Sequence, residues 1–225
     1  MSLAENLAAV RKQIENACQR VGRSSSDVKL IAVSKTHPTE VLREALKAGA
    51  AVFGENKVQE AEGKILSIGR DAAEWHLIGH LQSNKARKAV QLFDVIHTVD
   101  SVELAERLER ICIEEGRESL SVFAQVDLAG EETKSGIAEN DLPKLAAYLR
   151  TCERLKFDGL MIIPPFFDEP EATRPYFKRL REIRDATLPD GGLSMGMSGD
   201  FEVAIEEGAT VVRIGTAIFG QRPRN

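Results

Sequence analysis

The strongest constraint on the fold is an eightfold alternation between short apolar segments and longer amphipathic segments. The apolar segments are rich in β-branched residues, as buried strands are, and they cover residues 28–34, 50–54, 75–79, 94–99, 120–128, 157–163, 192–196 and 210–215. The intervening helix-like segments cover residues 39–49, 56–69, 83–93, 101–116, 140–155, about 171–186 and 201–208. Because each helix returns the chain to the start of the next strand, this alternation predicts a parallel sheet.

Eight strand–helix units in 225 residues, with no linker rich in Pro, Gly or Ser, predict a closed (β/α)8 TIM barrel. We expect one domain over residues 1–225, and an open doubly wound sheet is the alternative. An extra N-terminal helix precedes the first strand. Ser2 and Glu5 have capping-box spacing, apolar residues recur on one face after them, and Gly22 ends the helix.

The composition excludes several classes of function. With 30 basic and 35 acidic residues the net charge is -5, whereas a protein that binds a nucleic acid backbone needs a basic excess. No apolar run approaches the ~20 residues of a membrane span, and the first residues lack the apolar core of a signal peptide. We therefore expect a cytoplasmic protein without nucleic acid or membrane partners. Cys18, Cys112 and Cys152 are widely separated, so we expect small buried residues.

Two late motifs suggest a site for phosphate. GMSGD and RIGT follow the last two strands, which is where barrels usually bind phosphate. Their glycines let the backbone approach an anion, Ser198 and Thr216 supply hydroxyls, and each loop opens a helix. The alternative is that Gly196 and Gly199 only form a turn. Asp200 is negative, so we expect it to point away from the anion and to cap its own helix.

Lys35 is the other unusual residue, because it interrupts the first apolar segment at its carboxyl end. A partly desolvated lysine loses its proton more readily, and its neutral amine can attack an aldehyde to form a Schiff base. A surface lysine in a turn is the alternative. An amine across the barrel from the phosphate loops fits a phosphorylated aldehyde, of which pyridoxal 5′-phosphate (PLP) is the commonest.

Long motifs, in order along nearly the whole chain, resemble those of a known family. They are AVSKTHP, FGENKVQE, WHLIGHLQSNKARKAV, HTVDS, VDLAGEETKSGI, GLMIIPP and GLSMGMSGDFEVAIEEGATVVRIGTAIFG. The sequence resembles the YggS/PROSC (PLPBP) family of pyridoxal phosphate homeostasis proteins. The resemblance implies an alanine-racemase-like barrel that holds PLP as a Schiff base on Lys35.

The resemblance also implies roles for the residues around that lysine. Ser198, Gly215 and Thr216 would hold the phosphate, and Arg213 would face the pyridine nitrogen and disfavour its protonation. Asn56 would lie near the ring. Met197 and Ile163 are implied as lining residues, although GLMIIPP departs from many relatives, which carry smaller or polar residues in place of its two isoleucines.

The resemblance implies a role in PLP (vitamin B6) homeostasis and indirectly in amino-acid balance, without strong turnover. PLP-dependent apoenzymes are candidate recipients, and we expect a monomer or a weak homodimer. A PLP-dependent racemase-like enzyme is the alternative, and a sugar-phosphate aldolase is a third. Tyr148 and Tyr176, the two tyrosines, fall in predicted helices, so an acid opposite Lys35 is hard to find.

Other polar groups carry weaker hypotheses. His76 and His80 have HxxxH spacing, but they flank a strand end without an evident third ligand, so we predict no metal and expect them near the mouth of the site. His37 and His97 are expected to be structural. A basic patch, interpreted as a solvated helix face, comprises Lys85, Arg87 and Lys88. The polar loop Glu131–Lys134 is either a lid or plain surface.

Overall fold

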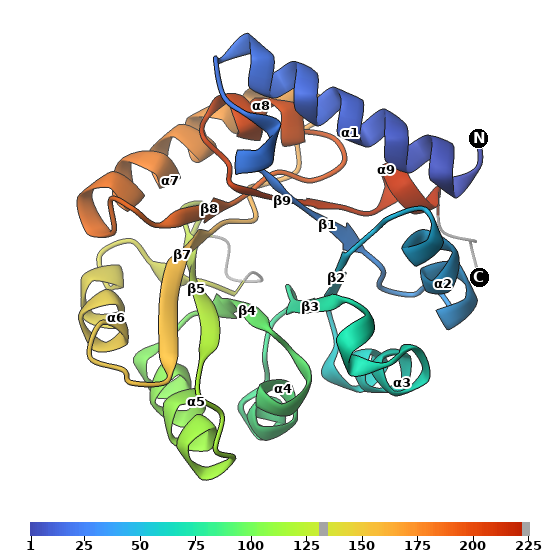
Figure 1. Cartoon of the computed structure of the whole chain (residues 1–225). Helices are drawn as coiled ribbons and strands as arrows, with labels where there is room; N and C mark the ends of the chain where they lie inside the picture. Colours follow the sequence, from blue (N-terminus) through green and yellow to red (C-terminus); the bar gives the residue numbers. More distant parts are fainter. Residues whose placement is uncertain (131–134, 222–225) are drawn as a thin grey trace.

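The computed structural model describes residues 1–130 and 135–221, and within these ranges parallel strands close into a barrel surrounded by helices (Figure 1). The strand order is β4-β3-β2-β1-β9-β8-β7-β5, and pairing of β4 with β5 closes the ring. The predicted (β/α)8 barrel is therefore confirmed. The alternative of an open sheet is wrong, because β4 and β5, which would be its edge strands, are hydrogen-bonded to each other.

The barrel strands lie where the apolar segments predicted them, with no boundary displaced by more than two residues. They are β1 (Lys29–Val33), β2 (Val52–Glu55), β3 (Glu74–Leu77), β4 (Val95–Val99), β5 (Leu120–Asp127), β7 (Leu155–Met161), β8 (Gly192–Ser194) and β9 (Val211–Ile214). A two-residue strand that the sequence did not indicate, β6 (Ile137–Ala138), pairs with the end of β5. The eight barrel strands are buried on both faces, which explains why their runs are mostly apolar.

The helices form an outer layer around the strands. They are α1 (Leu3–Arg20), α2 (Thr39–Lys47), α3 (Val58–Ile68), α4 (Ala86–Leu92), α5 (Val102–Glu114), α6 (Leu142–Leu149), α7 (Arg174–Thr187), α8 (Phe201–Glu206) and α9 (Thr216–Phe219). The predicted helix over residues 140–155 is too long, since the Thr151 hydroxyl and amide both bond to the Tyr148 carbonyl just after α6 ends. None of the helices in the described ranges is long and apolar enough to cross a membrane.

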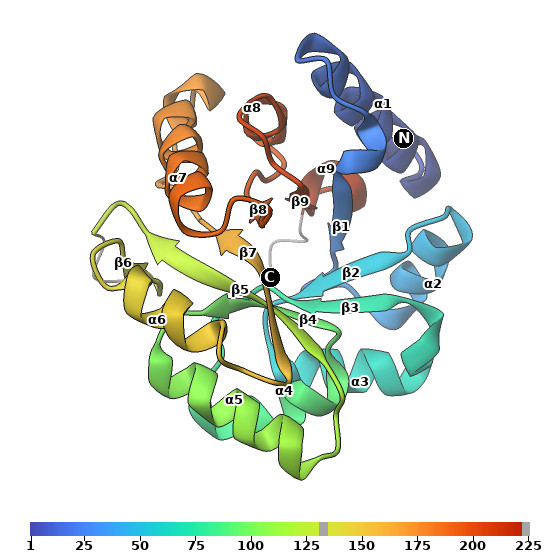
Figure 2. The ribbon, with the colours of Figure 1, turned by 60° about the vertical axis from the view of Figure 1, so that its left-hand side comes forward.

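Helix α1 begins with the predicted capping box. The Ser2 amide donates to Glu5 at 2.7 Å, and the Glu5 amide donates to the Ser2 hydroxyl at 3.2 Å. Leu7, Val10 and Ile14 are buried on one face of the helix, which packs against α8 and α9 (Figure 2). The extra helix therefore covers the part of the barrel where the last strand meets the first.

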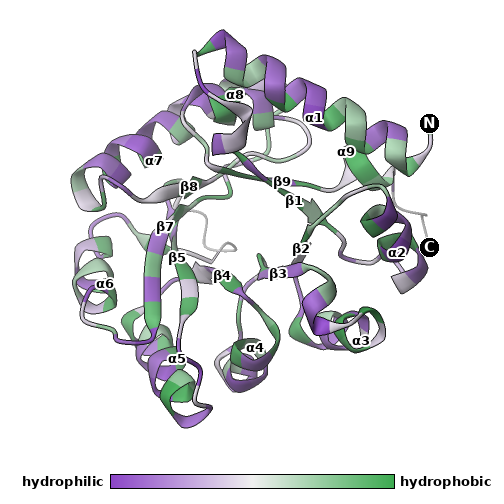
Figure 3. Cartoon of the chain, in the orientation of Figure 1, coloured by the Kyte–Doolittle hydropathy of each residue, from purple (hydrophilic) through white to green (hydrophobic). Residues whose placement is uncertain are grey.

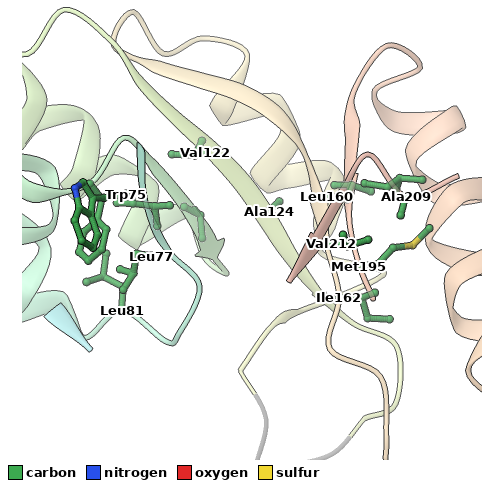
Figure 4. Packing of buried hydrophobic residues seen from close by; sticks show 14 of the residues in the cluster. Trp75, Leu77, Leu81, Val122, Ala124, Leu160, Ile162, Met195, Ala209 and Val212 are labelled. Carbon is green, nitrogen blue, oxygen red and sulfur yellow. The ribbon is translucent and has the colours of Figure 1, made fainter. Parts of the chain in front are cut away.

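Apolar residues form two packed regions. The larger lies between strands and helices, and Figure 4 shows part of it, with Trp75 and Leu77 on one wall and Leu160 and Val212 on another. The smaller lies inside the ring and includes Ile31, Val33, Ile78, Val95, Phe123, Met161 and Val211. Most helix residues coloured hydrophilic face away from the strands (Figure 3).

Two of the three cysteines are buried as predicted. Cys18 and Cys112 are buried and Cys152 is half-buried, and none of the three forms a disulfide. Burial raises the pKa of the Cys112 thiol to about 11, so this side chain is a neutral packing group at physiological pH.

Candidate functional site

Lys35 lies two residues after the end of β1, at the carboxyl end of the barrel, and is half-buried. The next residue, Thr36, has a φ of +68°, a left-handed conformation that is a genuine outlier for a β-branched side chain. The Thr36 amide donates to the Glu60 carboxylate at 2.5 Å. The backbone therefore turns sharply at the predicted lysine, and a charged side chain from α3 holds the turn.

A buried ionic cluster also fixes the other side of Lys35. The Ser34 hydroxyl donates to Glu55 at 2.6 Å. The Lys64 ammonium donates to the Ser34 carbonyl at 2.8 Å, to Glu55 at 2.7 Å and to Glu60 at 2.6 Å. We call Ser34, Glu55, Glu60 and Lys64 the lysine-turn cluster. It constrains the backbone on both sides of Lys35.

The two carboxyl groups of this cluster shift in opposite directions. Burial raises the pKa of Glu55, and the hydrogen bond from Lys64 only partly opposes this effect. Burial also raises the pKa of Glu60, but hydrogen bonds from Lys64 and the Thr36 amide lower it overall. Sequence analysis missed this cluster. The available signal was Glu55, a charged residue inside the motif FGEN, at the end of a buried strand.

The loops after β8 and β9 meet at Ser198. Its hydroxyl oxygen accepts hydrogen bonds from the amides of Gly215 and Ala217, both at 3.3 Å. One hydroxyl and two backbone N–H groups therefore converge between the two loops, with both N–H groups donating to the Ser198 oxygen. Met197 and Thr216 are exposed beside them. The structure thus brings the predicted phosphate residues together.

Asp200 corrects one expectation. Its carboxylate accepts a hydrogen bond from the Met197 amide at 2.6 Å, whereas α8 has no side-chain cap. It therefore closes the loop that precedes its helix. Gly196 supports the same turn with a φ of +92°, and a Cβ there would lie 2.6 Å from the Cβ of Ala204. The turn and the anion site are compatible features of one loop.

Lys35 and the phosphate loops lie side by side, so the expectation that they face each other across the barrel was wrong. Strands β1 and β9 are hydrogen-bonded neighbours, with Ala32 paired to Ile214. After the Lys35 turn, the His37 ring stacks on Phe219 of α9 with centroids 4.8 Å apart. Closure of the ring makes the last strand the neighbour of the first.

Arg213 is fully enclosed by the barrel wall. Its Nη1 donates to the Ser194 hydroxyl at 2.6 Å and its Nη2 to the Ile162 carbonyl at 2.8 Å. Burial lowers the pKa of Arg213 to about 10, with the Asp200 carboxylate opposing this shift. The guanidinium is therefore still a cation at neutral pH, and its position is fixed by two acceptors.

Asn56 and Ile163 add to the rim. Asn56 follows β2, and its Oδ1 atom is buried with no hydrogen-bond partner among the described residues. Such an atom costs free energy unless a ligand or water pairs with it. Ile163 packs against the apolar cluster inside the ring. Asn56 therefore offers an unpaired acceptor and Ile163 an apolar side chain at this end of the barrel.

The two histidines of the HxxxH motif are separated by burial. His76 is 2% exposed and lies inside the barrel, so its expected place at the mouth was wrong. The His80 side chain is 53% exposed, and its Nδ1 lies 3.6 Å from Asp100. Within the described ranges, no group of three or more His, Cys, Asp or Glu residues could hold a metal.

The remaining predictions concern surface groups. Arg87 pairs with Glu114 and Glu115, and Lys88 lies 2.8 Å from Glu62. This part of the basic patch is therefore balanced by neighbouring carboxylates on the helix surface. The loop Glu131–Lys134 lies outside the described residues.

Comparison with known proteins first defines the class of barrel. Residues 6–223 match the family model of the alanine racemase N-terminal domain. PipY of Synechococcus elongatus, solved with PLP bound, superposes with a TM-score of 0.84 at 42% identity, covering 97% of this chain and 100% of that one.

Full-length relatives narrow the class further. The chain is 43% identical to the pyridoxal phosphate homeostasis protein of Aquifex aeolicus, over 99% of both chains. It is 46% identical to that of Pseudomonas aeruginosa, over 98% of this chain and 96% of the relative. The chain therefore belongs to the pyridoxal phosphate homeostasis protein family, as the motifs implied.

Proposed function

We propose that the chain binds PLP reversibly at Lys35 and contributes to PLP homeostasis by buffering or delivering the cofactor. The proposal treats residues 1–225 as one PLP-binding barrel domain in the cytoplasm. It rests on similarity over the full chain to relatives named for PLP homeostasis and to a solved protein that contains PLP.

One observation carries the assignment to this site. The hydrogen-bonded pairing of β1 with β9 puts the Lys35 turn beside the loops that meet at Ser198. PLP contains an aldehyde and a phosphate on one small ring, so its binding site needs an amine close to an anion site. Sequence-distant residues supply both on adjacent strands.

The residues present fit PLP. When bound, PLP supplies an electrophilic aldehyde carbon, with which a lysine amine condenses with loss of water. Lys35 would hold the aldehyde, while Ser198, Gly215 and Thr216 would hold the phosphate. The unpartnered buried Oδ1 of Asn56 offers a polar contact near the ring.

Arg213 determines the electronic character of the proposed site. A guanidinium donates hydrogen bonds and accepts none, so next to the pyridine nitrogen it would leave that nitrogen unprotonated. This weakens PLP as an electron sink. Binding without strong turnover is therefore the proposed role, with PLP-dependent apoenzymes as recipients and a monomer or weak homodimer as the working form.

Reduction with borohydride followed by peptide mapping tests the site. The wild type incubated with PLP should carry the label on the peptide that contains Lys35, and Lys35→Ala should lose it. Lys57→Ala is the matched control, since Lys57 is an exposed lysine next to Asn56, and it should label normally. Equal labelling of Lys35→Ala, or a label on another lysine, would show that the assignment is wrong.

The absence of strong turnover is tested separately. Tyr148 lies on α6 and Tyr176 on α7, so neither stands at a strand end as a second acid or base. We expect the PLP-loaded protein to exchange the Cα hydrogen of either alanine enantiomer far more slowly than typical enzyme turnover of ~10 per second. Exchange at enzyme-like rates would favour the racemase alternative.

A further inference from the structure

A continuous hydrogen-bonded chain crosses the interior of the barrel from Arg213. Arg213 Nη1 lies 2.6 Å from Ser194 Oγ, which lies 2.9 Å from His97 Nδ1. His97 Nε2 lies 2.8 Å from His76 Nδ1, and His76 Nε2 lies 2.8 Å from Glu74 Oε1. We call these five residues the arginine chain. It links four strands, β9, β8, β4 and β3.

The far end of the arginine chain is an ion pair at the opposite end of the barrel from Lys35. Glu74 and Lys29 are the first residues of β3 and β1. The Lys29 ammonium donates to both Glu74 carboxylate oxygens, at 2.8 and 3.1 Å. Hydrogen bonds from His76 and Lys29 lower the pKa of Glu74 to about 2 although burial opposes them, so Glu74 is a carboxylate at neutral pH.

The two ends determine the direction of every hydrogen bond between them. Arg213 can only donate, and the Glu74 carboxylate can only accept. Burial lowers the pKa of both His76 and His97, so both imidazoles are neutral. His76 must then carry its proton on Nε2, His97 must carry its own on Nε2, and the Ser194 hydroxyl must donate to His97 Nδ1.

The imidazoles are held in place by packing as well as by hydrogen bonds. The His97 ring stacks on Phe123 with centroids 4.6 Å apart and an interplanar angle of 2°, and it lies 5.0 Å from the His76 ring. Both histidines are at most 2% exposed. Ring flips that would reverse the chain are therefore opposed by the surrounding side chains.

We propose that Ser194, His97, His76 and Glu74 are positioning residues for Arg213, which orient its guanidinium and balance its charge across the barrel. The inference rests on the proposed function, in which Arg213 faces the pyridine nitrogen of PLP. Ser194, within the arginine chain, holds Nη1 of Arg213, and the Ile162 carbonyl holds Nη2. The remaining N–H groups of Arg213 are then presented in one orientation.

This arrangement has a consequence that simple packing does not have. Glu74 lies at the amino-terminal end of β3, and His76 separates it from the other members of the arginine chain. Glu74 therefore does not touch the proposed site. A change in its charge alone should nevertheless alter how Arg213 acts on bound PLP. Glu74→Gln makes this change while it keeps an oxygen that accepts from His76.

The unloaded protein tests the direction of the chain. Nitrogen-15 NMR of histidine-labelled protein at pH 7 should show His76 and His97 as neutral Nε2–H tautomers, with assignments from His76→Gln and His97→Gln. A neutral Nδ1–H form at either position, or a rapidly exchanging mixture, would overturn the proposed direction.

Titration with PLP tests the effect on the site. We expect Ser194→Ala to bind PLP about tenfold more weakly, and Glu74→Gln about threefold, because a hydrogen bond to a charged group is lost or weakened. Both variants should move the visible absorption band, or the pH at which it titrates, in the same direction. Ser194→Thr keeps the hydroxyl and should restore most of the wild-type behaviour.

Thr173→Val is the matched control. It also removes a buried hydroxyl, which donates to the Pro170 carbonyl at 2.6 Å outside the barrel interior, and it should leave affinity and spectrum unchanged. If the wild type takes up PLP and Glu74→Gln and Ser194→Ala both match the control, the inference fails and the proposed function stands. If the wild type takes up no PLP, the proposed function fails and the inference fails with it.

Discussion

The lysine-turn cluster and the arginine chain solve the same problem with different chemistry. Both are largely buried polar assemblies, and each holds one basic residue of the proposed site: the lysine-turn cluster holds the turn at Lys35, and the arginine chain holds Arg213. In the cluster, Lys64 contacts two carboxylates directly, at 2.7 Å and 2.6 Å. In the arginine chain, neutral groups separate the Arg213 cation from the Glu74 carboxylate.

The two assemblies also act on different parts of the residue that they hold. The lysine-turn cluster bonds to the backbone of Ser34 and Thr36, and so fixes the turn that carries Lys35. The arginine chain instead holds the side chain of Arg213 itself, through a hydrogen bond to Ser194. In the proposed function Arg213 is an electrostatic partner of PLP, and such a partner acts best when it is held in advance.

The lysine-turn cluster should lose far more stability than the arginine chain when one of its members is replaced. Lys64→Met leaves Glu55, which is fully buried, without its cation. Breaking a buried ion pair in this way costs about 3–5 kcal/mol, which urea unfolding at pH 7 would measure. Lys88→Met is the matched control, because Lys88 and Glu62 form an exposed pair at 2.8 Å that contributes less than about 1 kcal/mol. Similar small losses in both variants would show that the lysine-turn cluster contributes no more to stability than an exposed ion pair.

Acid should weaken the arginine chain at its far end. The pKa of Glu74 is about 2 in the folded protein and about 4.3 when unfolded. Its contribution is therefore complete above the unfolded value and is lost as pH falls towards 2. Since about a third of the side chain is exposed, we expect a screened effect of about 1–2 kcal/mol. Urea unfolding of wild type and Glu74→Gln at pH 7 and pH 3 should show the two converging in acid.

Glu55→Gln provides the contrast for the acid experiment. Burial raises the pKa of Glu55, so its contribution to stability is present below the unfolded value and is lost as pH rises through the folded value. The difference between Glu55→Gln and wild type should therefore move in favour of the variant as pH rises from about 4.3. A parallel pH dependence for the Glu55→Gln and Glu74→Gln variants would show that both carboxylates have the same environment.

The fold could be predicted from the sequence because its strands are buried on both faces. Runs such as residues 120–128 are mostly apolar, and their limits are clear. The helix predicted over residues 140–155 was too long because amphipathic spacing continues to the start of β7, while the Tyr148 carbonyl already bonds to Thr151. Local hydrogen bonds of that kind leave no periodic signal.

The site could be predicted only in part. Lys35 and Ser198 were proposed from their place after strand ends and Arg213 from the family resemblance, and all three assignments stay predictions. The arginine chain was missed because each member was judged alone, so His97 was interpreted as merely structural. Period-two alternation points Glu74 and His76 to the same face of β3, but strand order and register were needed to bring them to His97.

The smallest effect concerns the turn that the lysine-turn cluster holds. Thr36 has a φ of +68°, where a Cβ atom costs about 1–2 kcal/mol and glycine has no such cost. After the larger unfolded-state entropy of glycine is subtracted, Thr36→Gly should be about 0.5–1 kcal/mol more stable than Thr36→Ala. At an ordinary φ the order is reversed. Urea unfolding of both variants gives the sign. A more stable glycine variant would confirm the left-handed φ beside Lys35, whereas a more stable alanine variant would show that residue 36 has an ordinary φ in the folded protein.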